Sequence, residues 1–137
     1  MRYFQGRLID HLHLRVADYA VSGGFYQAVL EALGHGGTIE HGPDWLCCDE
    51  LSVGQRAEGD APSSVHLCFQ AADRKAVDSF YAAALAAGGR DYGPPGLRDY
   101  HPGYYAAFVL DPDGNNIEAK CDERPLTRSA PVIEVTT

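Results

Sequence analysis

The stretch that decides the fold lies near the start of the chain, where residues 9–16 read IDHLHLRV, and it returns at residues 64–69, which read SVHLCF. When the sequence is shifted by 55 positions, ten of the 24 residues from His11 to Gly34 are identical to their counterparts, without a gap. A repeat of this length indicates two copies of one supersecondary unit. We therefore predict one domain of two paired modules rather than a solenoid, with His11 and His66 as counterparts.

Module one is expected at residues 8–55. Apolar and polar residues alternate over residues 8–16, which is typical of a half-buried strand with His11, His13 and Arg15 on its polar face. Asp18 is a suitable N-cap for a helix at 19–33. Three short strands then complete a β-α-β-β-β order, at about 37–41, 44–48 and 50–55.

Module two is expected at residues 64–121, after a polar linker at residues 56–63 that is rich in turn formers. It repeats the opening strand and then a helix, which Asp73 caps and which ends at about residue 87. A long loop is predicted at 90–103, followed by strands at 104–110 and 115–121 that the turn sequence DPDG joins. The C-terminal tail, residues 122–137, has no clear pattern, although 132–135 could add an edge strand.

Composition and charge exclude several classes of partner. The net charge is -8 and the basic residues form no run, which argues against a nucleic-acid surface. No apolar stretch is as long as a membrane span, and the first residues lack the plan of a signal peptide, so we expect a cytoplasmic protein without membrane contact. The four cysteines form no C-x-x-C pair, which argues against a zinc ribbon or a thioredoxin-type site.

Two histidines and a glutamate stand out as candidate metal ligands. His11 and His66 lie on the polar faces of equivalent strands, and Glu118 alternates with the apolar Ile117 and Ala119. Two histidines and one carboxylate are the facial-triad donor set, which suits Fe(II) or Mn(II) and leaves positions open for substrate; Zn and Ni also accept these donors. Module one has Ser52 at the place that matches Glu118, with Glu50 as a fallback. Polar residues on a solvated sheet face are the alternative interpretation.

These motifs also resemble a known family. DHLHLRV at 10–16, FY at 25–26, VHL at 65–67 and DPDGNNIE at 111–118 are similar to the vicinal oxygen chelate superfamily, which includes glyoxalases, bleomycin-resistance proteins and extradiol dioxygenases. The resemblance covers residues 8–121. It implies an α+β fold of two tandem βαβββ modules that form a curled mixed sheet around a metal or ligand cleft.

The resemblance also implies the ligand set. His11, His66 and Glu118 correspond to the ligands of one divalent metal ion, of the kind Fe, Mn, Zn or Ni. Glyoxalase I enzymes carry a fourth ligand, Glu or Gln, where this chain has Ser52, which argues against that activity. Extradiol dioxygenases and fosfomycin-modifying enzymes use the two-His, one-Glu set. Residues 96–108 resemble a subgroup of small glyoxalase-like proteins.

Two hypotheses follow for function. The first is a metal-dependent lyase, isomerase, dioxygenase or small-group transferase that chelates a small oxygenated molecule through two of its oxygens. His13, His101 and Tyr104 would be its catalytic residues, and Arg15 and Tyr100 would bind substrate. The second is a metal-free module that sequesters a drug or metabolite, as bleomycin-resistance proteins do. A homodimer is expected, and the metal ligands could meet within one chain or across its interface.

Overall fold

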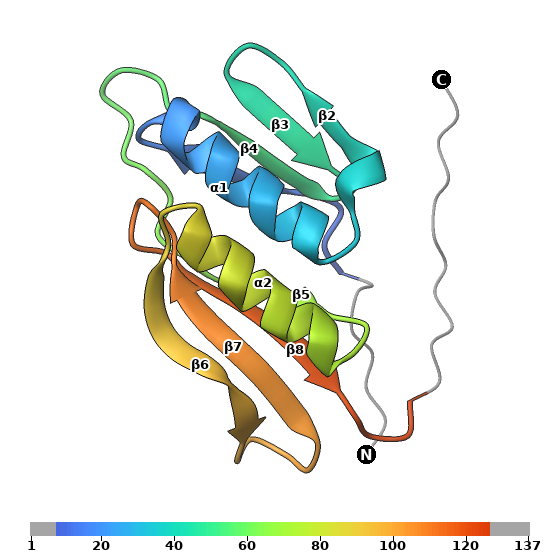
Figure 1. The fold of residues 1–137 in the computed structure, drawn as a ribbon. Coiled ribbons are helices and arrows are strands. Elements are labelled where there is room, and N and C mark those ends of the chain that lie inside the picture. The colour runs from blue at the N-terminus through green and yellow to red at the C-terminus, as the bar shows by residue number, and fades with distance from the viewer. Residues whose placement is uncertain (1–7, 127–137) are drawn as a thin grey trace.

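Eight strands form two four-stranded mixed sheets in the computed structural model, which describes residues 8–126 (Figure 1). The order of elements confirms the two β-α-β-β-β modules. The first comprises β1 (Leu12–Val16), α1 (Tyr19–Ala32), a 3-10 turn η1 (Gly36–Thr38), β2 (Ile39–His41), β3 (Trp45–Cys48) and β4 (Leu51–Gln55). The second comprises β5 (His66–Gln70), α2 (Arg74–Ala86), β6 (Arg90–Arg98), β7 (Tyr104–Leu110) and β8 (Asn116–Asp122).

The two helices begin and end in the same way. The Asp18 carboxylate accepts a hydrogen bond of 2.9 Å from the Ala20 amide, and the Asp73 carboxylate accepts one of 2.8 Å from Ala76. Both aspartates therefore cap their helices, as predicted. Gly34 and Gly88 follow the helices with φ of +95°, a conformation that glycine adopts without strain. Neither of these helices is long and apolar enough to cross a membrane, nor is any other helix within residues 8–126.

Equivalent strands pair in equivalent register. β1 runs parallel to β4 and aligns His13 with Ser52, whereas β5 runs parallel to β8 and aligns Cys68 with Glu118. Since His13 and Cys68 are counterparts in the repeat, Ser52 occupies the place of Glu118 in module one, as the sequence predicted. A serine at this position supplies no carboxylate to the face of the sheet.

The prediction of a loop at residues 90–103 is wrong, because most of this segment forms β6. β6 pairs antiparallel with β7 at the edge of its sheet, and its register shifts between Asp91 and Gly93 and again between Gly93 and Gly96. Pro94 and Pro95 lie in the second shift. Proline has no amide hydrogen, and it is tolerated in a strand at an edge or a bulge. The glycines and prolines that suggested a loop therefore mark the bulges of an edge strand.

Other boundaries differ by a few residues. Residues 36–38 form the 3-10 turn, so β2 begins at Ile39 rather than at about 37. β8 extends to Asp122, one residue into the predicted tail. The possible strand at 132–135 lies outside the described residues.

The two modules are joined through their helices. α1 and α2 lie side by side (Figure 1), and both contribute to one apolar core, in which Phe25 and Phe80 are fully buried. A Cβ atom on Gly89 would lie 2.8 Å from Phe25 Cε2, so this close approach requires glycine. In the described part of the chain each module forms one four-stranded mixed sheet, and no strand of one sheet pairs with a strand of the other.

A buried carboxylate also links the modules. Asp111, in the β7–β8 turn, is 1% exposed and accepts a 2.6 Å hydrogen bond from the Tyr26 hydroxyl of α1. It also accepts hydrogen bonds from the Asp113 amide and from the backbone and side-chain amides of Asn115. Burial and the Asp111 charge raise the pKa of Tyr26, so its hydroxyl stays protonated and donates. Asp113 in turn accepts from the Ala17 amide at 2.9 Å.

Tyr26→Phe tests this link. It removes one donor from a buried carboxylate, and we expect a loss of about 1–2 kcal/mol in the free energy of unfolding, measured by urea denaturation. Tyr105→Phe is the matched control, because the Tyr105 hydroxyl donates to the exposed Asp78 at 2.8 Å. If the two variants lose equal stability, the buried bond has no special role in joining the modules.

Candidate functional site

One pocket lies on the open face of the second sheet, opposite α2. It is lined by side chains from β5, β7 and β8 and from the β6–β7 turn: His66, Tyr100, Tyr104, Phe108, Asn116 and Glu118. Side chains alternate between the faces of a strand, so the residues between these, such as Ile117 and Ala119, are buried in the core. The pocket therefore combines two predicted metal ligands with three aromatic rings.

Glu118 is the centre of this pocket and is 2% exposed. Its Oε2 lies 3.0 Å from His66 Nε2, and its Oε1 accepts a 2.5 Å hydrogen bond from the Tyr104 hydroxyl. Desolvation and the hydrogen bond to Glu118 raise the pKa of Tyr104, so the phenol remains a donor. Both carboxylate oxygens are therefore held in place by neighbours from different strands.

The protonation of His66 follows from its second contact. Its Nδ1 lies 3.1 Å from the backbone carbonyl oxygen of Asn116, which can only accept a hydrogen bond, so Nδ1 carries the hydrogen. In a neutral imidazole, Nε2 would then turn its lone pair toward the Glu118 carboxylate. Two acceptors at 3.0 Å repel unless a cation lies between them. Three arrangements satisfy this contact: a second proton on His66, a proton on Glu118 Oε2, or a metal ion that both residues share.

Asn116 contributes an unused acceptor. Its side-chain Oδ1 is buried and has no hydrogen-bond partner among the described residues, although the residue lines the pocket. A buried polar atom without a partner costs free energy. A bound ligand that donates a hydrogen bond there would remove this cost.

The wall behind the pocket consists of Tyr104 and the residues that pack against its ring. Tyr100 and His101 contact its ring edge to face, with ring centroids 5.0 and 4.9 Å away, and the Lys120 ammonium lies 4.3 Å from the ring centroid. Asp122 holds the Lys120 ammonium at 3.1 Å and accepts from Arg124 at 2.7 Å. His101 Nε2 is buried, 3.5 Å from Asp122 Oδ2, and His101 does not line the pocket.

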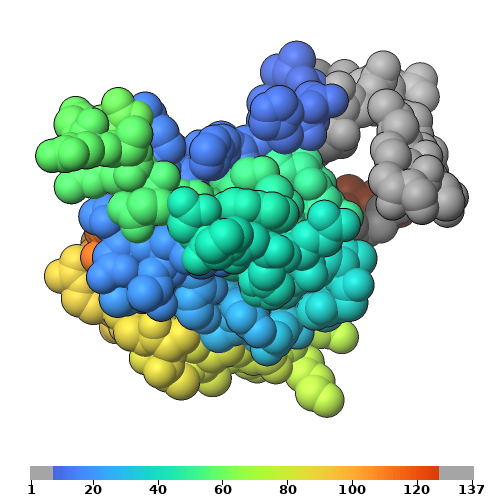
Figure 2. Space-filling model, turned by 90° about the horizontal axis from the view of Figure 1, so that it is seen from above, coloured from blue at the N-terminus to red at the C-terminus, as the bar shows by residue number. Residues whose placement is uncertain are grey.

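A second pocket lies on the open face of module one. Its lining includes His11, His13, Trp45, Cys47 and Ser52. In Figure 2 the green linker and the dark blue first described residues project from the molecule with a hollow between them. Cys47 Sγ lies 3.1 Å from Ser52 Oγ, while its neighbour Cys48 faces the core, so the two cysteines point to opposite faces as predicted.

Glycine shapes this second pocket as well. A Cβ atom on Gly54 would lie 3.0 Å from His13 Nε2, so the bare glycine leaves room for the imidazole. His11 itself is exposed and precedes β1, which begins at Leu12, so the prediction that His11 lies within the first strand is wrong. Its Nδ1 lies 2.7 Å from Asp10 Oδ1.

The predicted site residues are thus divided between two faces. His66, Glu118, Tyr104 and Tyr100 come together on the second sheet, and His11 and His13 line the pocket on the first. Within residues 8–126, His11, His66 and Glu118 do not form a group with ligand atoms within 4.8 Å of one another. Arg15 lines neither pocket, and its guanidinium lies 3.5 Å from the exposed Asp60 of the linker.

Phe108, Asn116 and Trp45 are among the lining residues that were not predicted from the sequence. Phe108 stacks on His66 with a centroid separation of 6.2 Å and an interplanar angle of 19°. The two-residue period of a strand could have found two of them, since Phe108 shares a face with Tyr104, and Asn116 shares one with Glu118. Trp45 shares its face with Cys47.

Comparisons with known proteins bear on the family and the fold of the chain. Residues 8–119 match the profile of the glyoxalase/bleomycin resistance protein/dioxygenase superfamily. A glyoxalase/bleomycin resistance protein from Albidiferax ferrireducens T118 is 31% identical, with a TM-score of 0.73, and the match covers 83% of this chain and 98% of that chain. A lactoylglutathione lyase from Agrobacterium tumefaciens is 19% identical, with a TM-score of 0.60 and coverage of 85% and 95%. A search of curated proteins found no match.

Asp122→Asn tests the wall behind the pocket. Hydrogen bonds from Arg124 are the main cause that lowers the pKa of Asp122 below its ordinary value of 3.8. Because folding lowers the pKa of Asp122, its ionised carboxylate stabilises the fold above pH 3.8, and this stabilisation is lost as the pH falls below that value. We therefore expect the variant to lose about 1–2 kcal/mol at pH 7 and progressively less below about pH 4, measured by urea unfolding. Asp60→Asn, which removes a charge from an exposed ion pair, should change the free energy of unfolding little. A loss of stability in Asp122→Asn that does not depend on pH would contradict the stabilising role assigned to the Asp122 charge.

Proposed function

The chain belongs to the glyoxalase/bleomycin resistance protein/dioxygenase superfamily, and on that basis we propose that it is a divalent-metal-dependent enzyme for a small oxygenated molecule. In this proposal His11, His66 and Glu118 are the metal ligands, and the substrate chelates the ion through two neighbouring oxygens. The observation that carries the proposal is the contact between His66 Nε2 and Glu118 Oε2 at 3.0 Å. Two ligands of one ion that lie at right angles, each about 2.1 Å from it, are about 3 Å apart.

The buried surroundings of Glu118 also support a metal ligand. An ionised carboxylate that is removed from water requires compensation. Tyr104 supplies one hydrogen bond to Oε1, which leaves Oε2 directed at His66. A carbonyl that holds the other nitrogen of a ligating histidine, as Asn116 does here, is the usual support for such a ligand. The donor set, oxygen and nitrogen without a thiolate, suits Fe, Mn, Zn or Ni.

The roles of the remaining residues follow from their positions. A bound divalent ion would act as a Lewis acid on a substrate oxygen. Tyr104 positions Glu118, Phe108 holds the ring of His66 by stacking, and Asn116 Oδ1 accepts a hydrogen bond from a substrate hydroxyl. Tyr100, which is 71% exposed, covers the substrate.

Three further predicted residues act from outside this pocket. His13 is the proposed proton acceptor, from the face of module one. Arg15 remains the candidate for an anionic substrate group, since its exposed pair with Asp60 is easily exchanged. His101 supports Tyr104 from behind through its ring contact.

The site needs a second chain in this proposal. The open face of module two holds two of the three ligands, and His11 lies on the open face of module one. A symmetric dimer that pairs module one of each copy with module two of the other would complete two identical sites. Such an arrangement is self-complementary, as a two-fold interface must be.

Metal content tests the ligand set. We expect about one divalent ion per chain to depend on this ligand set in protein purified without chelators or a histidine tag, and at least about a tenfold loss of affinity for that ion in His11→Gln, His66→Ala and Glu118→Gln. His41→Gln, on an exposed strand, is the control and should bind normally. Loaded protein would then be screened with 2-oxoaldehydes, catechols and epoxides. Failure to bind any of several divalent ions would refute the enzyme proposal.

Subunit mixing tests the shared site. His11→Gln and Glu118→Gln each damage one half of every site, so each homodimer should lack turnover. In an equal mixture after subunit exchange, half of the dimers are mixed, and each of these has one intact site. Activity and metal content should therefore recover to about a quarter of the wild-type level. No recovery, with exchange verified by mass spectrometry, would show that the sites do not form between chains.

The second candidate function is metal-free binding of a small molecule. It is favoured by the aromatic rings that line the pocket on module two, Tyr100, Tyr104 and Phe108. It would also explain the His66–Glu118 contact as an ion pair with a protonated imidazole. Chelator-treated protein would then bind aromatic compounds with unchanged affinity, and His66→Ala would not affect metal content because no ion would bind at His66.

A further inference from the structure

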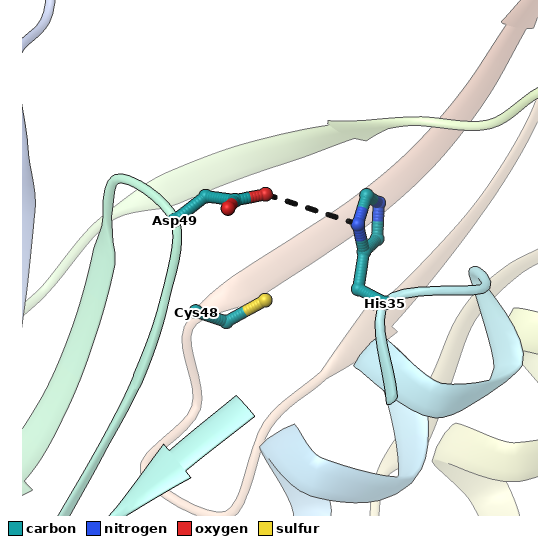
Figure 3. Close-up of side chains that lie close together, drawn as sticks. All are labelled: His35, Cys48 and Asp49. Carbon is teal, nitrogen blue, oxygen red and sulfur yellow. Dashed lines mark ion pairs between the residues drawn. The ribbon is translucent and has the colours of Figure 1, made fainter. Parts of the chain in front are cut away.

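A separate group of potential metal ligands lies at the far end of module one. His35 follows α1, Cys48 is the last residue of β3, and Asp49 lies in the turn between β3 and β4. Their side chains point toward one another (Figure 3), and the ligand atoms Nδ1 or Nε2, Sγ and carboxylate O all lie within 4.8 Å of one another. His35 Nδ1 is 4.0 Å from Asp49 Oδ2.

The group has one buried and one open side. Cys48 is 4% exposed and forms the base, while the side chains of His35 and Asp49 are 44% and 58% exposed. An ion could therefore reach the thiol from solvent between the two exposed side chains. Ligands of a tetrahedral zinc ion are separated by roughly 3.5 Å, so closure requires movements of about 1 Å at the two exposed side chains.

We propose that His35, Cys48 and Asp49 form a second metal site, which binds Zn²⁺ or a similar borderline ion with water as the fourth ligand. One nitrogen, one thiolate sulfur and one carboxylate oxygen are ligands that zinc accepts in tetrahedral geometry. The thiolate selects against magnesium and calcium, which prefer oxygen alone. The sulfur distinguishes this site from the proposed His11, His66 and Glu118 set, and the inference does not rest on that set.

Thr38 supports the thiol beside the proposed ion. Its hydroxyl donates to the His35 carbonyl at 3.0 Å, so in the contact of 3.3 Å with Cys48 the thiol is the donor. Metal binding replaces that proton, and the proton is released to solvent. Burial raises the pKa of Cys48, and the Asp49 charge raises it further. The shift disfavours a thiolate without a cation, so Cys48 is poorly suited to act as a nucleophile.

The position of the site indicates what the ion would do. It would connect the segment that follows α1 to the β3–β4 turn, two parts of module one that are separated by η1, β2 and β3. A ligand that binds the folded state alone stabilises it. The expected consequence is an increase in the Tm of the protein with added Zn²⁺, independent of substrate.

Cobalt substitution is the test. The protein used is the full chain carrying Cys47→Ser and Cys68→Ser, so that the thiols on the two open faces cannot contribute. Titration with Co²⁺ should produce a thiolate-to-cobalt charge-transfer band that saturates, and Zn²⁺ should abolish it. The His11, His66 and Glu118 set contains no sulfur, so cobalt there gives no such band, and the two proposals can fail separately.

Variants then assign the ligands. His35→Gln and Asp49→Asn should each weaken Co²⁺ binding, followed by the band, by about tenfold or more. Asp49→Asn preserves the left-handed turn, where Asp49 has φ of +48°, because asparagine also adopts it. His41→Gln and Asp44→Asn, both exposed, are the matched controls and should bind normally. The absence of the band, or a band that persists unchanged in His35→Gln and Asp49→Asn, would overturn the proposal.

Discussion

The buried hydrogen bonds to Asp111 are the interaction on which the arrangement of the two modules depends. This carboxylate is inaccessible to water, and it accepts from Tyr26 of α1 and from three groups of its own turn. Because each lost donor would leave a buried charge less well compensated, the turn has one favourable conformation against α1. The sequence DPDGN thereby docks the second module on the first, in addition to making the hairpin between β7 and β8.

The same turn also determines where the pocket residues lie. The Asn115 side chain accepts from the Val65 amide at 2.8 Å, which aligns the start of β5 with β8. The parallel register that follows places His66 beside Asn116 and Cys68 beside Glu118. His66 can therefore reach both the Asn116 carbonyl and the Glu118 carboxylate. The β7–β8 turn, which joins the two modules, and Asn116 and Glu118 of the pocket therefore lie in one stretch of sequence.

The pseudosymmetry of the chain does not extend to the chemistry of its open faces. Module two presents a carboxylate between an imidazole and a phenol, whereas the equivalent position of module one has Ser52 in contact with Cys47. The separation of the two pockets gives each face a different role. Module two holds most of the proposed ligand set, and module one contributes His11 and His13. On the opposite side of β3, Cys48 belongs to a different environment with His35 and Asp49.

The sequence by itself determined the repeat, the order of the elements, the helix caps and the alternation that places His66 and Glu118 on one open face. These features depend on neighbours a few residues apart, and periodicity reports them directly. Only the tertiary structure showed that residues 90–98 form an edge strand, because pairing with β7 outweighs the local preferences of Gly93, Pro94 and Pro95. It also decided that His11 lies apart from His66 and Glu118, and that His35 meets Cys48 and Asp49. These juxtapositions arise from the packing of helices and turns that are distant in the chain, on which local pattern carries no information.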